Sequence, residues 1–262
     1  DFTRALGTGV DQVQWTGSGG FAAFNADRVV NLGGAGATVT WATGSFVPNG
    51  STLYLGANSA THTVDFQNLI DLGSANRTID INNSAAAALD AIISGSISGS
   101  GGLTKNGDGT LLLQSTASSY TGQTNLAVNV TRVTKLADFG QPSSLGAGTA
   151  GVPITMASAF RPGILEYVGA GDSTNRTFAF GNTTATVTNS GTIQNNGSGP
   201  LVFTAANFND AIAGITVGRT LTLGGSNTGL NTIQGIIQNT NGVTGVLGVT
   251  KADAGTWVLA GA

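Results

Sequence analysis

Charged side chains are scarce in this 262-residue chain, in which Asp, Glu, Lys and Arg together make up 9% of the residues. Glu166 is the only glutamate, and the lysines are limited to Lys105, Lys135 and Lys251. Glutamate and lysine usually cover the exposed faces of helices, so their shortage argues against a helical protein. Disorder is excluded as well, because disordered chains combine low hydrophobicity with high net charge, whereas this chain is 40% hydrophobic with a net charge of -3.

Other absences narrow the classes of partner. The chain has no cysteine, a single histidine and no run of basic residues. Without a basic surface nothing attracts phosphates, so we expect no nucleic acid partner. No apolar stretch approaches the ~20 residues of a membrane-spanning helix, and we expect no membrane insertion by this segment. The missing cysteines fit a bacterial extracellular or surface protein that avoids disulfide chemistry, although many cytosolic chains also lack cysteine.

Glycine is abundant, with 41 residues, and short alternating or apolar runs recur between Gly, Asn, Ser and Asp. Such runs are typical of β-strands. The predicted strands are residues 37–42, 63–66, 77–82, 163–168, 176–180, 200–205, 219–223 and 255–259. Residues 83–92 and 205–214 are suited to a helical turn at a corner, but both are too short for the crossover of a parallel α/β sheet. The pattern predicts an all-β fold.

One segment occurs twice. "GLTKNGDGTLLL" at 102–113 aligns without gaps with "GVTKADAGTWVL" at 248–259, and "SANRT" at 74–78 is echoed by "STNRT" at 173–177. A unit of one or two short strands cannot bury its apolar face alone, so such units stack on one another. We therefore expect one β-solenoid domain over 1–262, with ~20 residues per coil, about 13 coils and a length of about 60 Å.

The stretch 101–124, "GGLTKNGDGTLLLQSTASSYTGQT", closely resembles the autotransporter-associated β-strand repeat, also called the passenger-associated transport repeat. The residues that match the repeat are Gly101, Gly102, Leu103, Thr104, Lys105, Gly107, Gly109, Thr110, Leu111, Leu113, Tyr120, Thr121 and Gly122. The second copy, within 248–262, keeps Thr250, Lys251, Gly255, Thr256 and Leu259. It has Asp253 where the repeat has an internal glycine, which leaves the conformation of that turn open.

This resemblance implies a right-handed parallel β-helix on the outer surface of a bacterial cell. We expect a segment of a longer structural protein, acting as a stalk, an adhesin shaft or a fibre subunit, without catalysis. Two alternatives stay open: a carbohydrate-binding adhesin module, and a polysaccharide-degrading enzyme built on a β-helix.

The sequence "KNGDGT" at 105–110 is compatible with a ligand loop or with a tight turn. The second copy favours the turn, because "KADAGT" moves the aspartate by one place, which a ligand set does not tolerate. We assign Gly107, Gly109 and Gly255 as structural turn positions, and expect unusual backbone angles at Gly109 and Gly255. No catalytic residue, cofactor or metal is predicted.

Isolated candidates for chemistry have structural interpretations. We interpret His62 as a surface or turn residue and Glu166 as a solvent-facing strand residue. Scattered aspartates could converge across coils, but we predict no metal there; they are Asp65, Asp71 and Asp80. Four aromatic residues are suited either to stacking on a sugar or to packing in the core and at the ends, and we favour packing; they are Trp15, Trp41, Tyr54 and Trp257.

Both ends of the predicted solenoid lack an obvious cap. "DFTRALGTGV" is short, and "GTWVLAGA" finishes on an apolar run. An uncapped coil exposes unpaired backbone groups and an apolar cross-section. We expect end-to-end contacts with copies of the chain or with further coils of the same polypeptide, with Trp257 as a possible end contact. Surface glycans are a further possible partner.

Overall fold

The computed structural model describes residues 1–156, 161–181, 190–209, 218–239 and 246–261. Within these ranges every regular element is a β-strand, and every pairing between strands is parallel. The described residues contain no helix long and apolar enough to cross a membrane. The prediction of an all-β fold is confirmed, and the parallel strands in stacked sheets are consistent with a β-solenoid.

The strands form two long and two short sheets. The nine-stranded sheet contains β2 (Arg28–Val30), β5 (Val64–Phe66), β8 (Ala91–Ile93), β11 (Leu111–Leu113), β13 (Asn129–Val133), β15 (Gly163–Tyr167), β18 (Gly191–Asn195), β20 (Arg219–Gly224) and β22 (Leu247–Lys251). The seven-stranded sheet contains β1 (Gly19–Phe21), β4 (Leu53–Leu55), β7 (Arg77–Ile81), β10 (Leu103–Asn106), β12 (Thr124–Leu126), β14 (Ile154–Met156) and β17 (Phe178–Phe180). The short sheets contain β3 (Thr38–Thr40), β6 (Leu69–Asp71) and β9 (Ile97–Ser98), and β16 (Asp172–Thr174), β19 (Leu201–Phe203), β21 (Asn231–Ile233) and β23 (Trp257–Leu259).

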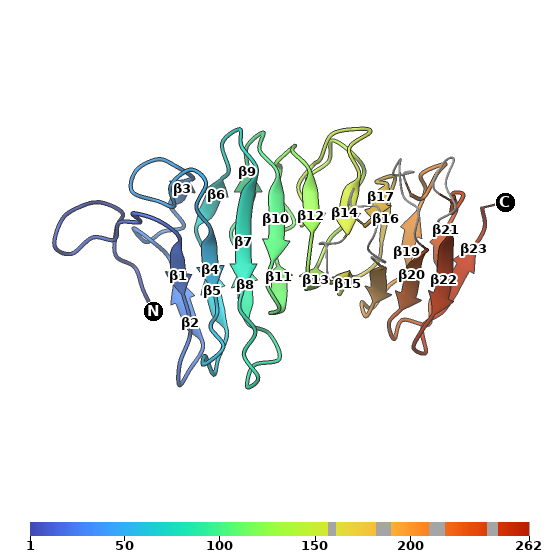
Figure 1. Ribbon diagram of the computed structural model, residues 1–262, viewed down its shortest axis with the longest axis horizontal. Coiled ribbons are helices and arrows are strands. Elements are labelled where there is room, and N and C mark those ends of the chain that lie inside the picture. Colours follow the sequence, from blue (N-terminus) through green and yellow to red (C-terminus); the bar gives the residue numbers. More distant parts are fainter. Residues whose placement is uncertain (157–160, 182–189, 210–217, 240–245, 262) are drawn as a thin grey trace.

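The chain visits these sheets in turn. β7, β8 and β9 lie in three different sheets, and β10 then returns to pair with β7. One such circuit is called a coil below. Figure 1 shows the coils stacked along the long axis of the molecule, from β1 near one end to β23 near the other.

The core runs along the inside of this stack. In β11, Leu111 and Leu113 are buried and Leu112 between them is half-buried, because successive side chains of a strand point to opposite faces. The inward positions also line up from coil to coil: Leu111 pairs with Ala91 on one side and Thr131 on the other, and all three are buried. Each coil therefore covers the apolar row of its neighbours.

Each of the eight predicted strands overlaps a strand of the structure. The helical turn expected at 83–92 is absent: Ser84 and Asp90 hold this corner as a loop, in which the Ser84 amide donates to Asp90 Oδ1 at 2.6 Å, and β8 starts at Ala91. The other expected turn, 205–214, is irregular up to Asn209 and otherwise lies outside the described residues.

The expected coil number and length were wrong. Neighbouring coils are offset by 20 residues in some places and by 36 in others, because loops of variable length are inserted at the corners. The longest sheet accordingly has nine strands in the described part of the chain. At about 4.8 Å per strand it is about 40 Å long.

The two ends of the stack differ. At the N-terminal end, Phe2 adds to the free edge of β2, donating its amide to Val29 O at 2.7 Å, and the Trp15 ring packs edge-on against Phe21 and Phe46. The first residues of the chain thus cover part of this end, contrary to our expectation of an uncapped coil. At the C-terminal end, β22 and β23 are the outermost strands of their sheets in the described residues.

Candidate functional site

Lys105 is the centre of the turn between β10 and β11. Its side chain alternates inward with Leu103 and is only 1% exposed. The Nζ atom donates three hydrogen bonds, to the carbonyl oxygens of Gly107 at 2.8 Å, Gly109 at 2.6 Å and Val128 at 2.6 Å. An ammonium group has three donors, and all three are used here.

Two opposing effects set the charge of this lysine. Burial lowers the pKa of Lys105 from its ordinary value to about 8, while the carboxylates of Asp80, Asp108 and Asp90 favour the charged form. At neutral pH the ammonium form predominates. Lys105 is thus a buried cation held by backbone carbonyls, with carboxylates nearby.

The two glycines of this turn meet different structural requirements. Gly107 has a left-handed backbone, with φ of 79°, and a Cβ atom there would lie 2.3 Å from Ile81 O. Gly109 is not left-handed; a Cβ atom there would lie 2.6 Å from Ile81 Cγ2 and 2.9 Å from Asn82 O. Our expectation of unusual backbone angles at Gly109 was therefore wrong, because close approach of the preceding coil requires this glycine instead.

The second copy of the motif keeps part of this geometry at a different corner of the stack. β22 lies in the nine-stranded sheet and β23 in a short one, whereas β10 and β11 lie in the two long sheets. Lys251 again donates to the backbone of its own turn, to Asp253 O at 2.7 Å and to Ala252 O. Asp253 stands in the position of Gly107 and has the same left-handed conformation, with φ of 58°. The turn thus forms without a glycine at this position.

Gly255 and Trp257 follow in the second copy. Gly255 is not left-handed either, and a Cβ atom there would lie 2.6 Å from Gly225 O, so the close approach seen at Gly109 recurs. The half-buried Trp257 ring stacks on Phe203 with 6.3 Å between centroids, and its Nε1 donates to Gly224 O at 3.0 Å. Its role as an end contact stays a prediction.

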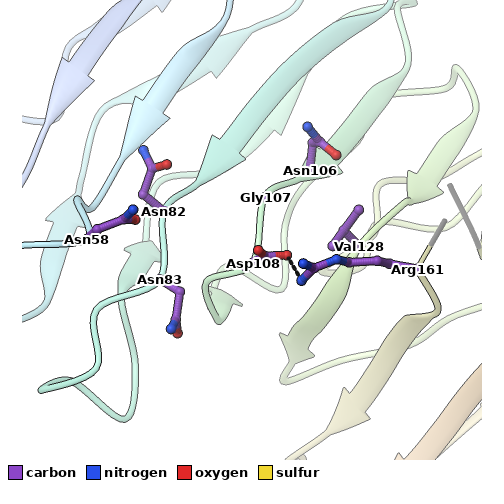
Figure 2. A pocket seen from close by; sticks show the side chains of 8 residues that line it. All are labelled: Asn58, Asn82, Asn83, Asn106, Gly107, Asp108, Val128 and Arg161. Carbon is purple, nitrogen blue, oxygen red and sulfur yellow. Dashed lines mark hydrogen bonds and ion pairs between the residues drawn. The ribbon is translucent and has the colours of Figure 1, made fainter.

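A polar groove lies beside the Lys105 turn, between the corner loops of neighbouring coils. Its volume is about 380 Å³, and it is lined by Asn58, Asn82, Asn83, Asn106, Gly107, Asp108, Val128 and Arg161. Figure 2 shows Asn58, Asn82 and Asn83 on one side and Asp108 and Arg161 on the other. Asp108 Oδ1 and Arg161 Nη1 form an ion pair at 2.5 Å. We refer to these eight residues as the groove.

Glu166 has a structural environment that the sequence did not suggest. We predicted a solvent-facing residue, and that was wrong, because Glu166 is buried in β15. Its Oε2 accepts a hydrogen bond from Arg132 Nε at 2.9 Å on β13, and its Oε1 accepts one from Asn196 at 2.8 Å. Both carboxylate oxygens therefore hold neighbouring coils together.

The other titratable candidates are dispersed. His62 is half-buried, and its Nδ1 lies 2.8 Å from Thr61 Oγ1. Asp65, Asp71 and Asp80 each accept hydrogen bonds from nearby groups of the chain. In the part of the chain that the structure describes, no three His, Cys, Asp or Glu side chains come together as a metal site.

The aromatic candidates separate into two groups. Trp15 and Trp41 are buried in the core at the N-terminal end, and Trp257 packs against the core at the other end. Tyr54 is exposed on the outward face of β4. Packing thus accounts for three of the four aromatic residues, and Tyr54 stays available at the surface.

Buried arginines were missed by the sequence analysis. Arg77 Nε donates to Leu72 O at 2.9 Å, and Arg176 Nη1 donates to Leu145 O at 2.8 Å; each guanidinium also lies over an aromatic ring. Burial lowers the pKa of both arginines. The signal was present in the echo of "SANRT" and "STNRT", whose arginines both turn inward to hold a loop.

Stacked parallel coils with inward cations define a repetitive all-β protein. The chain is 36% identical over 188 residues to the adhesin BmaC autotransporter of Brucella suis biovar 1 (strain 1330). The match covers 72% of this chain and 5% of that protein, so the chain spans a small part of its relative's length. No family model and no solved structure matches the chain.

Proposed function

We propose that the chain is part of an extracellular structural protein of a bacterial surface, in which it forms the shaft of an adhesin and carries out no catalysis. The observation that carries this proposal is the stack of parallel coils along the described chain, together with the similarity to an autotransporter adhesin. Both features are expected of an elongated protein that extends away from the cell surface. The proposed location is the outer cell surface or the extracellular space.

We further propose that the whole of 1–262 is one right-handed parallel β-helix whose segments 101–124 and 248–262 are autotransporter-associated repeats. The lysine that both copies contain supports the repeat, because Lys105 donates to Gly107 O and Lys251 donates to Asp253 O, the equivalent carbonyl of its own turn. We propose that the structure of the repeat depends on three features that the two copies share: the lysine, the turn that follows it and the closely packed glycine.

The geometry of the stack suits a shaft. Backbone hydrogen bonds between coils run along the long axis, so each added coil lengthens the rod without changing its cross-section. Polar side chains reinforce this axis: Asn68 of one coil accepts from Leu32 N at 2.7 Å in the preceding coil and donates back to Leu32 O at 2.8 Å.

The C-terminal face supports a proposed partner, which is a further coil of the same polypeptide or of a second copy. Leu113 is 3% exposed under its following coil, whereas its counterpart Leu259 is 52% exposed. Leu103 and its counterpart Val249 differ in the same way, at 2% and 43%. An added coil on this face would bury these side chains and extend both sheets.

A labelling experiment tests the proposed function. Antibodies raised against the 262-residue segment should bind intact cells that make the protein, and immunogold electron microscopy should place the label at a distance from the membrane on an extended structure. External protease should remove the signal without cell lysis. Label that appears only after permeabilisation would contradict the proposal.

The two alternatives have unequal support. A carbohydrate-binding role is favoured by the polar groove, whose lining is rich in asparagine. A polysaccharide-degrading role finds less support, since the carboxylate of Glu166 is engaged by Arg132 and Asn196 rather than facing an open site.

A further inference from the structure

The groove contains amide groups that the fold does not use. The side chains of Asn58 and Asn83 make no hydrogen bond within the described protein, although each offers an acceptor oxygen and two donor hydrogens. The side chains of Asn82 and Asn106 are bonded only through Nδ2, to Gly56 O and to Asp80, which leaves both Oδ1 atoms free. The groove thus presents six or more unused hydrogen-bonding positions on three consecutive coils.

Asparagines elsewhere in the stack contrast with these. Buried Asn231 accepts from Leu201 N at 3.0 Å and donates to Thr256 O at 2.8 Å, so it connects the coils on both sides. An asparagine of that kind is explained by the fold alone. Asn58 and Asn83 are exposed and have no such contact, so their amides are open to a ligand that lies in the groove.

Charge in the groove is balanced. The carboxylate of Asp108 pairs with Arg161, and the carboxylate of Asp80 next to it accepts from Asn106. Val128 is the one apolar side chain among the lining residues. An apolar ligand finds too little apolar surface here, and a charged ligand finds its counter-charge already occupied. The lining instead matches a neutral molecule with many hydroxyl groups.

The strands at the groove disfavour a peptide as the ligand. An extended peptide binds by adding to a free sheet edge, with pockets for its side chains. β7 already pairs with β4 and β10, and β10 pairs with β7 and β12. No backbone edge is open at this site, and recognition must therefore go through the amides.

We propose that the groove is a binding site for a neutral oligosaccharide, whose hydroxyl groups bond to the amides of Asn58 and Asn83. The volume of about 380 Å³ lies within the range of about 300–1,000 Å³ found for ligand sites. The amides come from successive coils, so the sugar chain lies along the axis of the stack. This goes beyond the shaft role, because it gives the side of the shaft its own binding activity.

The test uses the 262-residue chain and an immobilised panel of neutral and carboxylate-bearing di- to tetrasaccharides. The chain should bind at least one neutral member, and the affinity should be the same at low and high salt. The double variant Asn58→Ala, Asn83→Ala should weaken binding by about tenfold or more, as expected for the loss of hydrogen bonds to the ligand. Asn207→Ala is the matched control, since Asn207 is an exposed asparagine outside the groove, and it should bind like the parent chain.

Three outcomes would overturn the proposal. They are the absence of binding to every neutral member, equal affinity of the double variant and the parent chain, and preferential binding of acidic members that Arg161→Gln abolishes. Circular dichroism and the melting temperature of each variant show whether it is folded. Cell-surface labelling of the parent protein tests the shaft role independently, so failure of sugar binding leaves that role untouched.

Discussion

Lys105 Nζ donates a 2.6 Å hydrogen bond to the carbonyl oxygen of Val128, which belongs to the following coil. The other two donors of the same ammonium close the turn of their own coil through Gly107 and Gly109. One buried cation therefore fixes a turn and joins two coils. Three carbonyl oxygens converge on one nitrogen atom here, which suits an ammonium group better than the planar fork of donors of an arginine, and this explains why the motif contains lysine.

Replacing Lys105 by methionine should destabilise the protein by about 2–4 kcal/mol, because three buried carbonyls lose their donor while the stem still fills its space. The free energy of unfolding from urea titration measures the effect. Lys251→Met is the control: Lys251 is exposed, and its loss should change stability by less than about 0.5 kcal/mol. Equal losses in the two variants would show that the third, inter-coil hydrogen bond contributes nothing.

The depressed pKa of Lys105 predicts a specific pH dependence. The folded protein releases this proton near pH 8, whereas the unfolded chain keeps it to about 10.5. Between these values the unfolded state binds more protons, so this group's contribution to stability rises with pH and is lost again as pH falls to 8. The stability of the parent chain relative to Lys105→Met should increase by about 2 kcal/mol from pH 7 to pH 10.

Urea titrations of the parent chain and of Lys105→Met at several pH values test this pH dependence. The difference between their free energies of unfolding cancels the titration of other groups. A difference that stays constant over this range would mean that Lys105 keeps its ordinary pKa.

Gly109→Ala should destabilise by about 1–3 kcal/mol, because the added Cβ atom would overlap with Ile81 Cγ2 and Asn82 O of the preceding coil. Gly17→Ala is the matched control, since a Cβ atom at Gly17 has no neighbour within 4 Å and the backbone is not left-handed there. The urea midpoint should fall for the first variant and stay nearly unchanged for the second. Similar midpoints for the two variants would contradict the close-approach explanation.

Strand positions and their stacking were predictable because alternation and repetition are local signals. The alternation in β11 and the likeness of 102–113 to 248–259 can both be recognised in the sequence without knowledge of which coils touch. The coil number was not predictable, because it depends on the loops: Asp27 of one coil meets Thr63 of the next across 36 residues, whereas Asp90 meets Thr110 across 20.

The contacts of the site were harder to foresee than the fold. The turn glycines were identified, but the reason for Gly109 lies in Ile81 of another coil, and sequence spacing does not reveal which coils touch. The burial of Glu166 likewise depends on Arg132 in the preceding coil, which lies 34 residues away. The groove is assembled from loops of several coils, and no single stretch of sequence contains it.

Glu166 and Arg132 should be energetically coupled, because the pair is largely withdrawn from solvent, with side chains 10% and 30% exposed. A double-mutant cycle with Glu166→Gln and Arg132→Met should give a coupling energy of about 1–3 kcal/mol. The exposed pair Arg4 and Asp11, 3.8 Å apart, is the control and should give less than about 0.5 kcal/mol. Additive effects of the two substitutions would show that the pair does not join its coils.

The C-terminal face should make the chain associate in a concentration-dependent way. Leu259 and Val249 occupy inward positions of their strands yet are about half exposed, and both strands offer a free edge in the described structure. Contact with another copy buries this apolar surface, and the cover over the N-terminal end by residues 1–18 favours pairs joined at their C-terminal faces over long filaments.

Sedimentation velocity over a range of concentrations should therefore show a monomer that converts to a dimer. Leu259→Asp should shift the midpoint of this conversion to about tenfold higher concentration or beyond, because dimerisation would then bury an unpaired charge. Val10→Asp is the control: Val10 is 98% exposed and lies at the opposite end, so its replacement should leave the conversion unchanged. A parent chain that stays monomeric at the highest concentration, or equal behaviour of the two variants, would rule out this face as a contact surface between copies.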